Sequence, residues 1–154
     1  MSTKQFTLTA VKARSDHHLL LTYADGAKWG VDLNPILASV PALARLADAS
    51  VFRKAKLGPW GGSVVWADDE NLELAADNLR ARAIKQAGGC SHEFIWNWMA
   101  RHELTLDAAA QALGLSRRML AYYRSGHKPV PRTVALACLG WQHAAPELRV
   151  ALAA

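Results

Sequence analysis

The chain contains 154 residues, of which 51% are hydrophobic and 20% are charged. These fractions are close to those of average globular proteins and exclude a chain that is disordered throughout. The length is sufficient for one ordinary domain or two small ones. No apolar run reaches the roughly 18 to 20 residues of a membrane span, and the N-terminus lacks the apolar core of a secretory signal. We therefore expect a cytoplasmic protein that does not enter a membrane.

The positive charges are distributed unevenly along the chain. The formal net charge is +5, and residues 88–154 contain seven Lys or Arg against four Asp or Glu. No acidic residue lies between Asp107 and Glu147. Five basic residues fall there within sixteen consecutive positions: Arg117, Arg118, Arg124, Lys128 and Arg132. A local field of one sign indicates an acidic partner, most commonly nucleic acid, although a solvated basic face is the alternative.

A strand pattern characterises the N-terminal half. Apolar and threonine residues alternate over positions 6–10 until Val11 breaks the alternation. Two further strands are expected over residues 17–24 and 27–33. They flank Asp25-Gly26, a dipeptide that favours a two-residue hairpin turn.

The rest of the N-terminal half alternates between short elements. Proline at position 35 ends the hairpin, since it cannot donate a hydrogen bond to a sheet. We expect a helix at 41–47, a strand at 51–57, a turn at 58–62, a strand at 63–67, an acidic loop at 68–73 and a helix from Leu72 to Ala83. These elements predict a small α+β domain over residues 1–87, in which a helix covers one face of a small antiparallel or mixed sheet.

The pattern changes at Gly88-Gly89, where we place a domain boundary. The second domain, residues 88–154, contains no convincing strand and is rich in alanine, so we expect it to be all-α. Its expected helices cover residues 93–103, 106–113, 117–124, 131–141 and 146–154. The residues expected to cap or end the first three helices are Ser91, Thr105, Gly114, Ser116 and Gly126.

The second and third of these helices have the spacing of a helix-turn-helix. Ala110 is small where the helices would cross, and Gly114 can take the left-handed conformation that the turn requires. The residues expected to hold the crossing from inside are Ala109, Leu113, Leu115, Leu120 and Tyr123. The residues that share the outer face of the third helix are Arg117, Arg118, Ala121, Tyr122 and Ser125. The N-terminal end of such a face is where recognition helices contact base edges.

Residues 93–142 resemble the Cro/repressor-type, or lambda-repressor-like, helix-turn-helix domain. The matching positions are Leu104-Thr105, Ala110, Leu113-Gly114, Ser116, Tyr123, Gly126 and Pro129. The chain departs from the family pattern at Leu106, where a phosphate-contacting glutamine is common, and at Arg124, where an acid is common. The resemblance implies a transcriptional regulator that binds double-stranded DNA sequence-specifically, and a degenerate motif with protein contacts only is the alternative. The expected DNA-binding residues are Thr105, Ser116, Arg117, Arg118, Ala121, Tyr122, Arg124, Ser125, Lys128 and Arg132.

The N-terminal half resembles a small bacterial family known as domain of unknown function 2442. The residues that carry this resemblance are Leu20 to Tyr23, Asp25-Gly26, Asp32-Leu33, Pro35, Phe52, Gly62, Trp66 and Leu72. Members occur alone or fused to a helix-turn-helix, and some are encoded beside toxin-like partners. The resemblance therefore implies a fold, and allows an antitoxin-like autorepressor that binds a toxin-like protein through this domain.

The remaining motifs do not indicate an enzyme, a cofactor or a metal site. Residues 58–62 lack the Gly-Lys-Ser/Thr that would complete a phosphate loop, and the histidines lack metal-ligand spacing. The acidic segment from Asp68 to Glu73 lacks the glycine of a calcium loop. Cys90 has no neighbouring base that would activate a nucleophile.

We also expect a homodimer, because one recognition helix reads only a few base pairs. The expected interface is formed by the apolar helix at residues 146–154 together with Trp141. The alternative is that this tail folds back on its own subunit.

Overall fold

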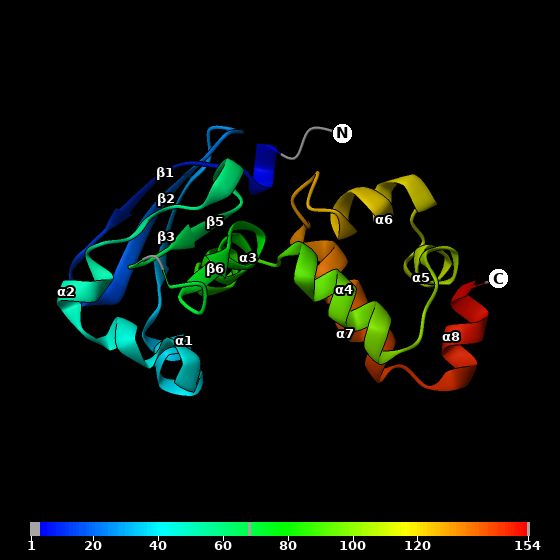
Figure 1. Ribbon diagram of the computed structural model, residues 1–154. Helices are drawn as coiled ribbons and strands as arrows, with labels where there is room; N and C mark the ends of the chain where they lie inside the picture. The colour runs from blue at the N-terminus through cyan, green and yellow to red at the C-terminus, as the bar shows by residue number, and fades with distance from the viewer. Residues whose placement is uncertain (1–3, 68, 154) are drawn as a thin grey trace. The chain divides into compact units, whose positions relative to one another are not determined.

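The structure is a computed structural model that describes residues 4–67 and 69–153 (Figure 1). It consists of two compact units, an N-terminal unit that ends at Ala87 and a C-terminal unit that begins at Gly88. Of the features expected from the sequence, the first three residues, Asp68 of the acidic segment and Ala154 of the last helix lie outside the described residues. Within those residues, no helix combines the length and the apolar character needed to cross a membrane.

The N-terminal unit contains two three-stranded antiparallel sheets, in which neighbouring strands follow the chain order. The strands are β1 (Leu8–Ala13), β2 (His18–Tyr23) and β3 (Lys28–Asp32) in the first sheet, and β4 (Lys56–Leu57), β5 (Ser63–Val65) and β6 (Glu73–Ala75) in the second. The helices are α1 (Asn34–Ser39), α2 (Ala49–Phe52) and α3 (Ala76–Gln86). Shorter 3-10 segments are η1 (Lys4–Phe6), η2 (Ser15–His17), η3 (Pro41–Ala47) and η4 (Pro59–Gly61). The expected mixture of helices with antiparallel strands is confirmed, but the strands form two sheets and not one.

A β-bulge interrupts the pairing of β1 with β2. Leu8 lies opposite Tyr23 and Ala10 lies opposite Thr22, so Thr9 is an extra residue in β1. Leu8 is buried in the core, and after the bulge Val11 and Ala13 pack against the same core. The bulge therefore explains why the alternation in the sequence changes phase at Val11.

The hairpin between β2 and β3 differs from the two-residue turn expected from Asp25-Gly26. The N–H of Tyr23 donates to the carbonyl of Ala27 at 2.9 Å, and the N–H of Gly26 donates to the carbonyl of Tyr23 at 2.9 Å. Of the two central residues only Gly26 has a positive φ, 88°. The loop is thus a three-residue connection in which one left-handed glycine follows a tight turn.

Two expectations for the second half of this unit are wrong. Residues 51–57 do not form one strand, because α2 ends at Phe52 and only Lys56–Leu57 pair with β5. The Asp48 carboxylate caps α2 by accepting a hydrogen bond from the N–H of Ser50 at 2.8 Å. The helix expected from Leu72 instead begins at Ala76, because the preceding residues form β6. Pairing with β5 is a distant interaction that overrides the local helical pattern.

The core of the N-terminal unit is built from fully buried aliphatic and aromatic side chains, among them Leu21, Val31, Leu46, Trp66 and Leu79. Helix α3 packs against β3 and supplies Leu79 to this core. The buried hydroxyl of Tyr23 is hydrogen-bonded, since its Oη donates to the carbonyl of Ala76 at 2.8 Å. Burial raises the pKa of the Tyr23 phenol far above its ordinary value of 10.0, which keeps the hydroxyl protonated.

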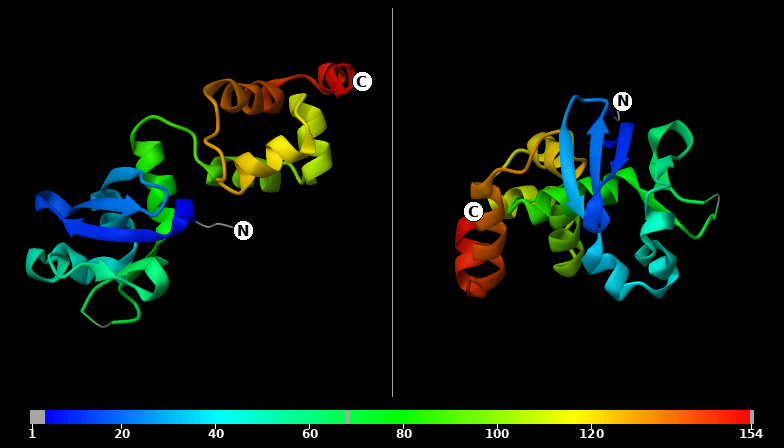
Figure 2. Two further views of the ribbon diagram at one scale, coloured as in Figure 1. Left: turned by 90° about the horizontal axis from the view of Figure 1, so that it is seen from above. Right: turned by 90° about the vertical axis from the view of Figure 1, so that its left-hand side faces the viewer.

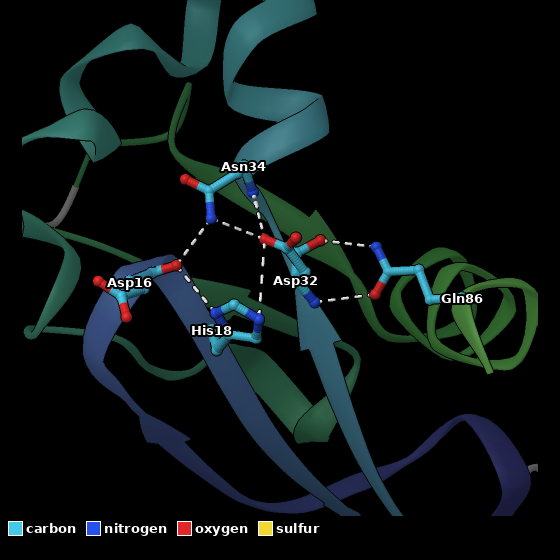
Figure 3. A network of polar contacts seen from close by, with 5 residues as sticks. All are labelled: Asp16, His18, Asp32, Asn34 and Gln86. Carbon is cyan, nitrogen blue, oxygen red and sulfur yellow. Dashed lines mark hydrogen bonds and ion pairs between the residues drawn. The ribbon is translucent and has the colours of Figure 1, made fainter.

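A polar network joins the end of β3 to the end of α3 (Figure 3). The Gln86 side chain exchanges two hydrogen bonds with the main chain of Asp32. The Asp32 carboxylate accepts hydrogen bonds from the main-chain N–H of Asn34 at 2.9 Å and from its Nδ2 at 2.8 Å. The main-chain hydrogen bond is the largest cause of a lowered Asp32 pKa. The network therefore fixes where β3 ends and α1 begins.

In the described part of the C-terminal unit every regular element is a helix (Figure 2). Its helices are α4 (His92–Arg101), α5 (Leu106–Leu113), α6 (Arg117–Arg124), α7 (Arg132–His143) and α8 (Pro146–Ala153). The expected bounds of the second and third helices are confirmed to the residue, and the first helix ends two residues before the expected Glu103. The core includes the buried side chains Ile95, Trp98, Ala109, Leu120 and Cys138.

Candidate nucleic-acid interface

Helices α5 and α6 are joined by a three-residue turn, positions 114–116. Gly114 has φ 67° and ψ 28°, the left-handed conformation expected from the sequence. The N–H of Leu115 donates to the carbonyl of Ala110 at 2.9 Å, which satisfies a carbonyl at the end of α5. Ser116 then caps α6 by accepting a hydrogen bond from the N–H of Met119 at 3.2 Å. The turn is therefore defined by a main-chain hydrogen bond on the α5 side and by a side-chain cap on the α6 side.

The crossing of α5 and α6 is apolar. Ala109, Ala110 and Leu120 are buried to 3% exposure or less, and Tyr123 is 9% exposed. Leu113 and Leu115 are partly buried against the same cluster. The expected inner face is thus the buried face. Small alanines on α5 allow the two helices to pack closely.

The opposite face of α6 is accessible to a ligand. Arg117, Arg118 and Ser125 are exposed there, and Ala121 and Tyr122 are partly exposed. The first turn of any helix leaves main-chain N–H groups without intrahelical partners, and the helix dipole adds positive potential at that end. The two arginines extend from this end of α6. Acceptor atoms and negative charge are therefore favoured at this position.

Tyr122 is the centre of a cluster formed by α6 and the turn that follows it. Its Oη accepts a hydrogen bond from Arg118 Nε at 2.8 Å. The Arg118 guanidinium carbon lies 5.5 Å from the ring centroid, and Lys128 Nζ lies 5.2 Å from it. The His127 ring stacks on Tyr122 with 4.9 Å between centroids and 36° between planes. The cluster gathers two cations around one partly exposed aromatic ring.

Arg117 differs from Arg118 in having an acidic partner. Its Nε lies 3.5 Å from Asp107 Oδ1 on α5, and both side chains are exposed, to 67% and 72%. An exposed ion pair of this kind contributes about 1 kcal/mol or less. Arg117 can therefore exchange Asp107 for an incoming anion at small cost.

The structure separates the other expected site residues into three groups. Arg124 lies away from the outer face of α6, because its guanidinium carbon sits 4.8 Å from the ring centroid of Trp96 on α4. Thr105 and Ser125 act locally: Thr105 Oγ1 caps α5, and Ser125 Oγ donates to the carbonyl of Tyr122 at 3.2 Å. Arg132 is exposed at the first position of α7.

Three residues at this site were missing from the sequence prediction: Asp107, Trp96 and His127. The contact between Asp107 and Arg117 becomes visible only when α5 and α6 are crossed in three dimensions. His127 reaches Tyr122 because Gly126 has φ 72°, which turns the chain back after α6. A glycine directly after a predicted helix could have indicated this reversal.

The thiols and the potential metal ligands do not form a second candidate site. In the chain segments that the structure describes, no three His, Cys, Asp or Glu side chains come together to hold a metal ion. Burial raises the pKa of the Cys90 thiol to about 11 and that of the Cys138 thiol to about 12. Both thiols therefore stay protonated near neutral pH.

One side chain of the C-terminal tail binds the end of α7 in its own subunit. Arg149 of α8 donates from Nε to the carbonyl of Trp141 at 2.8 Å and from Nη2 to that of Gln142 at 2.8 Å. The Trp141 ring also packs edge-on against Trp98, with 5.3 Å between centroids. Trp141 is therefore occupied within its own unit. Large apolar side chains nevertheless remain exposed on α7 and α8, namely Leu136, Leu139, Leu148, Val150 and Leu152.

The chain is similar to known proteins in both of its units. Residues 8–85 match the family model described as protein of unknown function (DUF2442). No curated protein matches the chain. The crystal structure of the putative DNA binding protein NE0471 from Nitrosomonas europaea is similar to this chain, with 44% sequence identity and a TM-score of 0.85. The match covers 97% of this chain and 95% of that one.

Proposed function

The chain belongs to the DUF2442 family, and we propose that its C-terminal unit gives this member sequence-specific binding to double-stranded DNA. In this proposal α5, the turn at 114–116 and α6 act as a helix-turn-helix of the Cro/repressor type. The protein would then be a transcriptional regulator. The similar Nitrosomonas europaea protein is named a putative DNA binding protein, which supports the proposal of DNA binding.

The observation that carries the proposal is the contrast between the two faces of α6. Leu120 and Tyr123 are buried against α5 and α4, whereas Arg117 and Arg118 extend from the N-terminal end of the other face. A helix that only filled a core would not need two exposed arginines there. A recognition helix does, because it enters the major groove with its N-terminal residues toward the base edges.

The remaining basic residues fit contacts with phosphates. Lys128 follows α6 and Arg132 begins α7, and both are exposed. No acidic residue occurs between Asp107 and Glu147, and of the basic residues in this stretch Arg117 is the one paired with Asp107. Phosphate contacts supply affinity without sequence information, and base contacts supply specificity.

A homodimer would let two such helices read neighbouring half-sites about one helical turn apart. The exposed side chains Leu148, Val150 and Leu152 on α8 support this assembly, with exposures of 51%, 71% and 66%. Exposed apolar patches on a folded protein often mark sites of protein–protein contact. Trp141 is not part of the proposed interface, because it packs within its own unit.

The N-terminal unit carries an observation that favours a protein partner. Trp60 is 97% exposed and has φ 57°, in a loop where the neighbouring Gly61 is buried against β1. A rigidly presented tryptophan is a frequent anchor of protein interfaces. An antitoxin-like autorepressor would use this loop for a toxin-like protein and α6 for its operator.

Selection of bound duplexes from a random pool tests the DNA-binding proposal. Wild type should enrich one motif, and Arg118→Ala should relax the preference at specific positions. The matched variant Lys128→Ala should weaken binding to all duplexes alike. Absence of any enriched motif together with retained binding of a protein partner would favour the alternative, an interaction adaptor with a degenerate helix-turn-helix.

A further inference from the structure

We infer that Tyr122 is a positioning residue that aims Arg118 at a guanine in the major groove. This inference rests on the proposed function. It specifies that Arg118 reads a base and that Tyr122 holds the Arg118 side chain in place. The observation behind it is the hydrogen bond of 2.8 Å from Arg118 Nε to Tyr122 Oη, which joins the exposed Arg118 to the partly exposed Tyr122 about one helical turn further along α6.

The geometry of the guanidinium determines what this hydrogen bond leaves available. An arginine carries one N–H on Nε and four on its two terminal nitrogens. Tyr122 occupies the Nε edge of Arg118, so the edge formed by the two terminal nitrogens is the one left for a bidentate contact. Two parallel N–H donors match O6 and N7 of guanine, whereas adenine presents a donor beside its N7.

Tyr122 is itself held in place by the turn that follows α6. The N–H of Lys128 donates to the carbonyl of Tyr122 at 3.2 Å, and Ser125 Oγ donates to the same carbonyl at 3.2 Å. His127 then stacks on the ring from this turn. The hydroxyl that holds Arg118 is therefore fixed before any ligand arrives, which lowers the entropy lost when a base is bound.

Arg117 is less suited to the same task. Its Nε faces the Asp107 carboxylate at 3.5 Å, and a carboxylate beside a base-reading guanidinium competes with the acceptors of guanine. The partner of Arg118 is a neutral hydroxyl, which leaves the positive charge of the guanidinium uncompensated. The two adjacent arginines thus have different roles, with base reading assigned to Arg118.

The test compares wild type, Tyr122→Phe, Arg118→Ala and the double variant on one series of duplexes. The parent duplex is the motif that wild type enriches from a random pool, and each G·C pair is replaced in turn by A·T. For Tyr122→Phe we expect the discrimination at one guanine to fall about 2- to 10-fold, the range of a typical net contribution from one hydrogen bond. In the Arg118→Ala background the same change should have no further effect at that position, because the residue that it positions is gone.

Two further readouts separate positioning from a structural role. The slope of log Kd against log salt and the thermal unfolding of Tyr122→Phe should match wild type, since the ring that Lys128 and His127 contact is retained. In NMR spectra the Nε–H signal of Arg118 should exchange more slowly with solvent in wild type than in Tyr122→Phe.

The outcomes distinguish this inference from the proposed function. Wild type that enriches a motif while Tyr122→Phe keeps full discrimination at every guanine overturns the positioning role alone. Loss of discrimination by Tyr122→Phe that persists in the Arg118→Ala background overturns it as well. Wild type that binds no duplex overturns the proposed function and the inference together.

Discussion

Gln86, the last residue of α3, pairs with the main chain of Asp32 as a neighbouring strand would. Its Oε1 accepts a hydrogen bond from the N–H of Asp32 at 2.8 Å, and its Nε2 donates to the carbonyl of Asp32 at 2.7 Å (Figure 3). Fifty-four positions separate the two residues in the sequence. The contact therefore joins the end of a helix to the edge strand of a sheet whose residues lie much earlier in the sequence.

Replacing Gln86 with alanine should loosen this edge. We expect Gln86→Ala to lower the free energy of unfolding of the N-terminal unit by about 1 to 2 kcal/mol, because two hydrogen bonds to the main chain of Asp32 are lost. Hydrogen exchange at the amide of Asp32 measures the effect directly. The neighbouring exposed variant Lys85→Ala should leave that exchange rate unchanged, and equal rates in both variants would contradict the role of Gln86.

The Asp32 carboxylate should make stability depend on pH. Hydrogen bonds, chiefly from the main chain of Asn34, lower its pKa below the ordinary value of 3.8. The ionised form is thus stabilised in the folded state, and this contribution is complete above the ordinary pKa and disappears as the pH falls through the lowered one. Asp32→Asn should therefore unfold more easily than wild type at neutral pH, with the difference shrinking below about pH 4. Urea unfolding at a series of pH values tests this prediction. A difference in the free energy of unfolding between wild type and Asp32→Asn that increases as the pH falls would contradict it.

Gly61 should tolerate no side chain. It has φ 70°, and a Cβ at this position would collide with the main-chain oxygen of Leu8. We expect Gly61→Ala to destabilise the N-terminal unit by at least about 2 kcal/mol, since the left-handed conformation and the collision both act against it. Gly62 is the matched control, because its φ is −78°. A Cβ added at Gly62 would lie 3.4 Å from the nearest atom, the main-chain oxygen of Pro59. Thermal unfolding of Gly62→Ala should stay close to wild type, and equal losses in both variants would exclude the collision as the cause.

The proposed dimer makes a prediction about mass in solution. Light scattering at micromolar concentration should give twice the chain mass of 16.8 kDa. The double substitution Val150→Asp with Leu152→Asp should give a monomer with unchanged helix content, because both side chains are exposed and contribute little to the fold of their own unit. Glu147→Gln, also on α8, should remain dimeric. A monomeric wild type would contradict the proposed assembly.

The helices of the candidate interface could be predicted because their signals are local. Thr105 and Ser116 cap α5 and α6 with their own hydroxyls, and Gly114 takes the left-handed conformation directly after α5. Each of these devices acts within about four residues of its position, so it is visible in the sequence. The bounds of both helices follow from them.

The second sheet and the contacts of α6 depend on distant residues and could not be predicted in the same way. Glu73–Ala75 has a helical composition and becomes a strand only because β5 lies beside it. Likewise, the sequence groups Arg124 with the expected DNA-binding residues. In the structure its guanidinium instead lies over the ring of Trp96, which belongs to another helix. Such pairings are set by how elements pack, which a local pattern does not contain.

The salt dependence of duplex binding tests the central claim most directly. Four of the basic residues near α6, Arg117, Arg118, Lys128 and Arg132, are exposed. If about three or four phosphates are neutralised per subunit, log Kobs should fall with log salt at a slope of about −3 for each bound subunit, and about twice that for the proposed homodimer. Fluorescence anisotropy of a labelled duplex between about 50 and 200 mM salt measures this slope, and Lys128→Ala should reduce its magnitude by about 1 per bound subunit. No binding at the lowest salt, or an affinity that does not change with salt, would contradict the account.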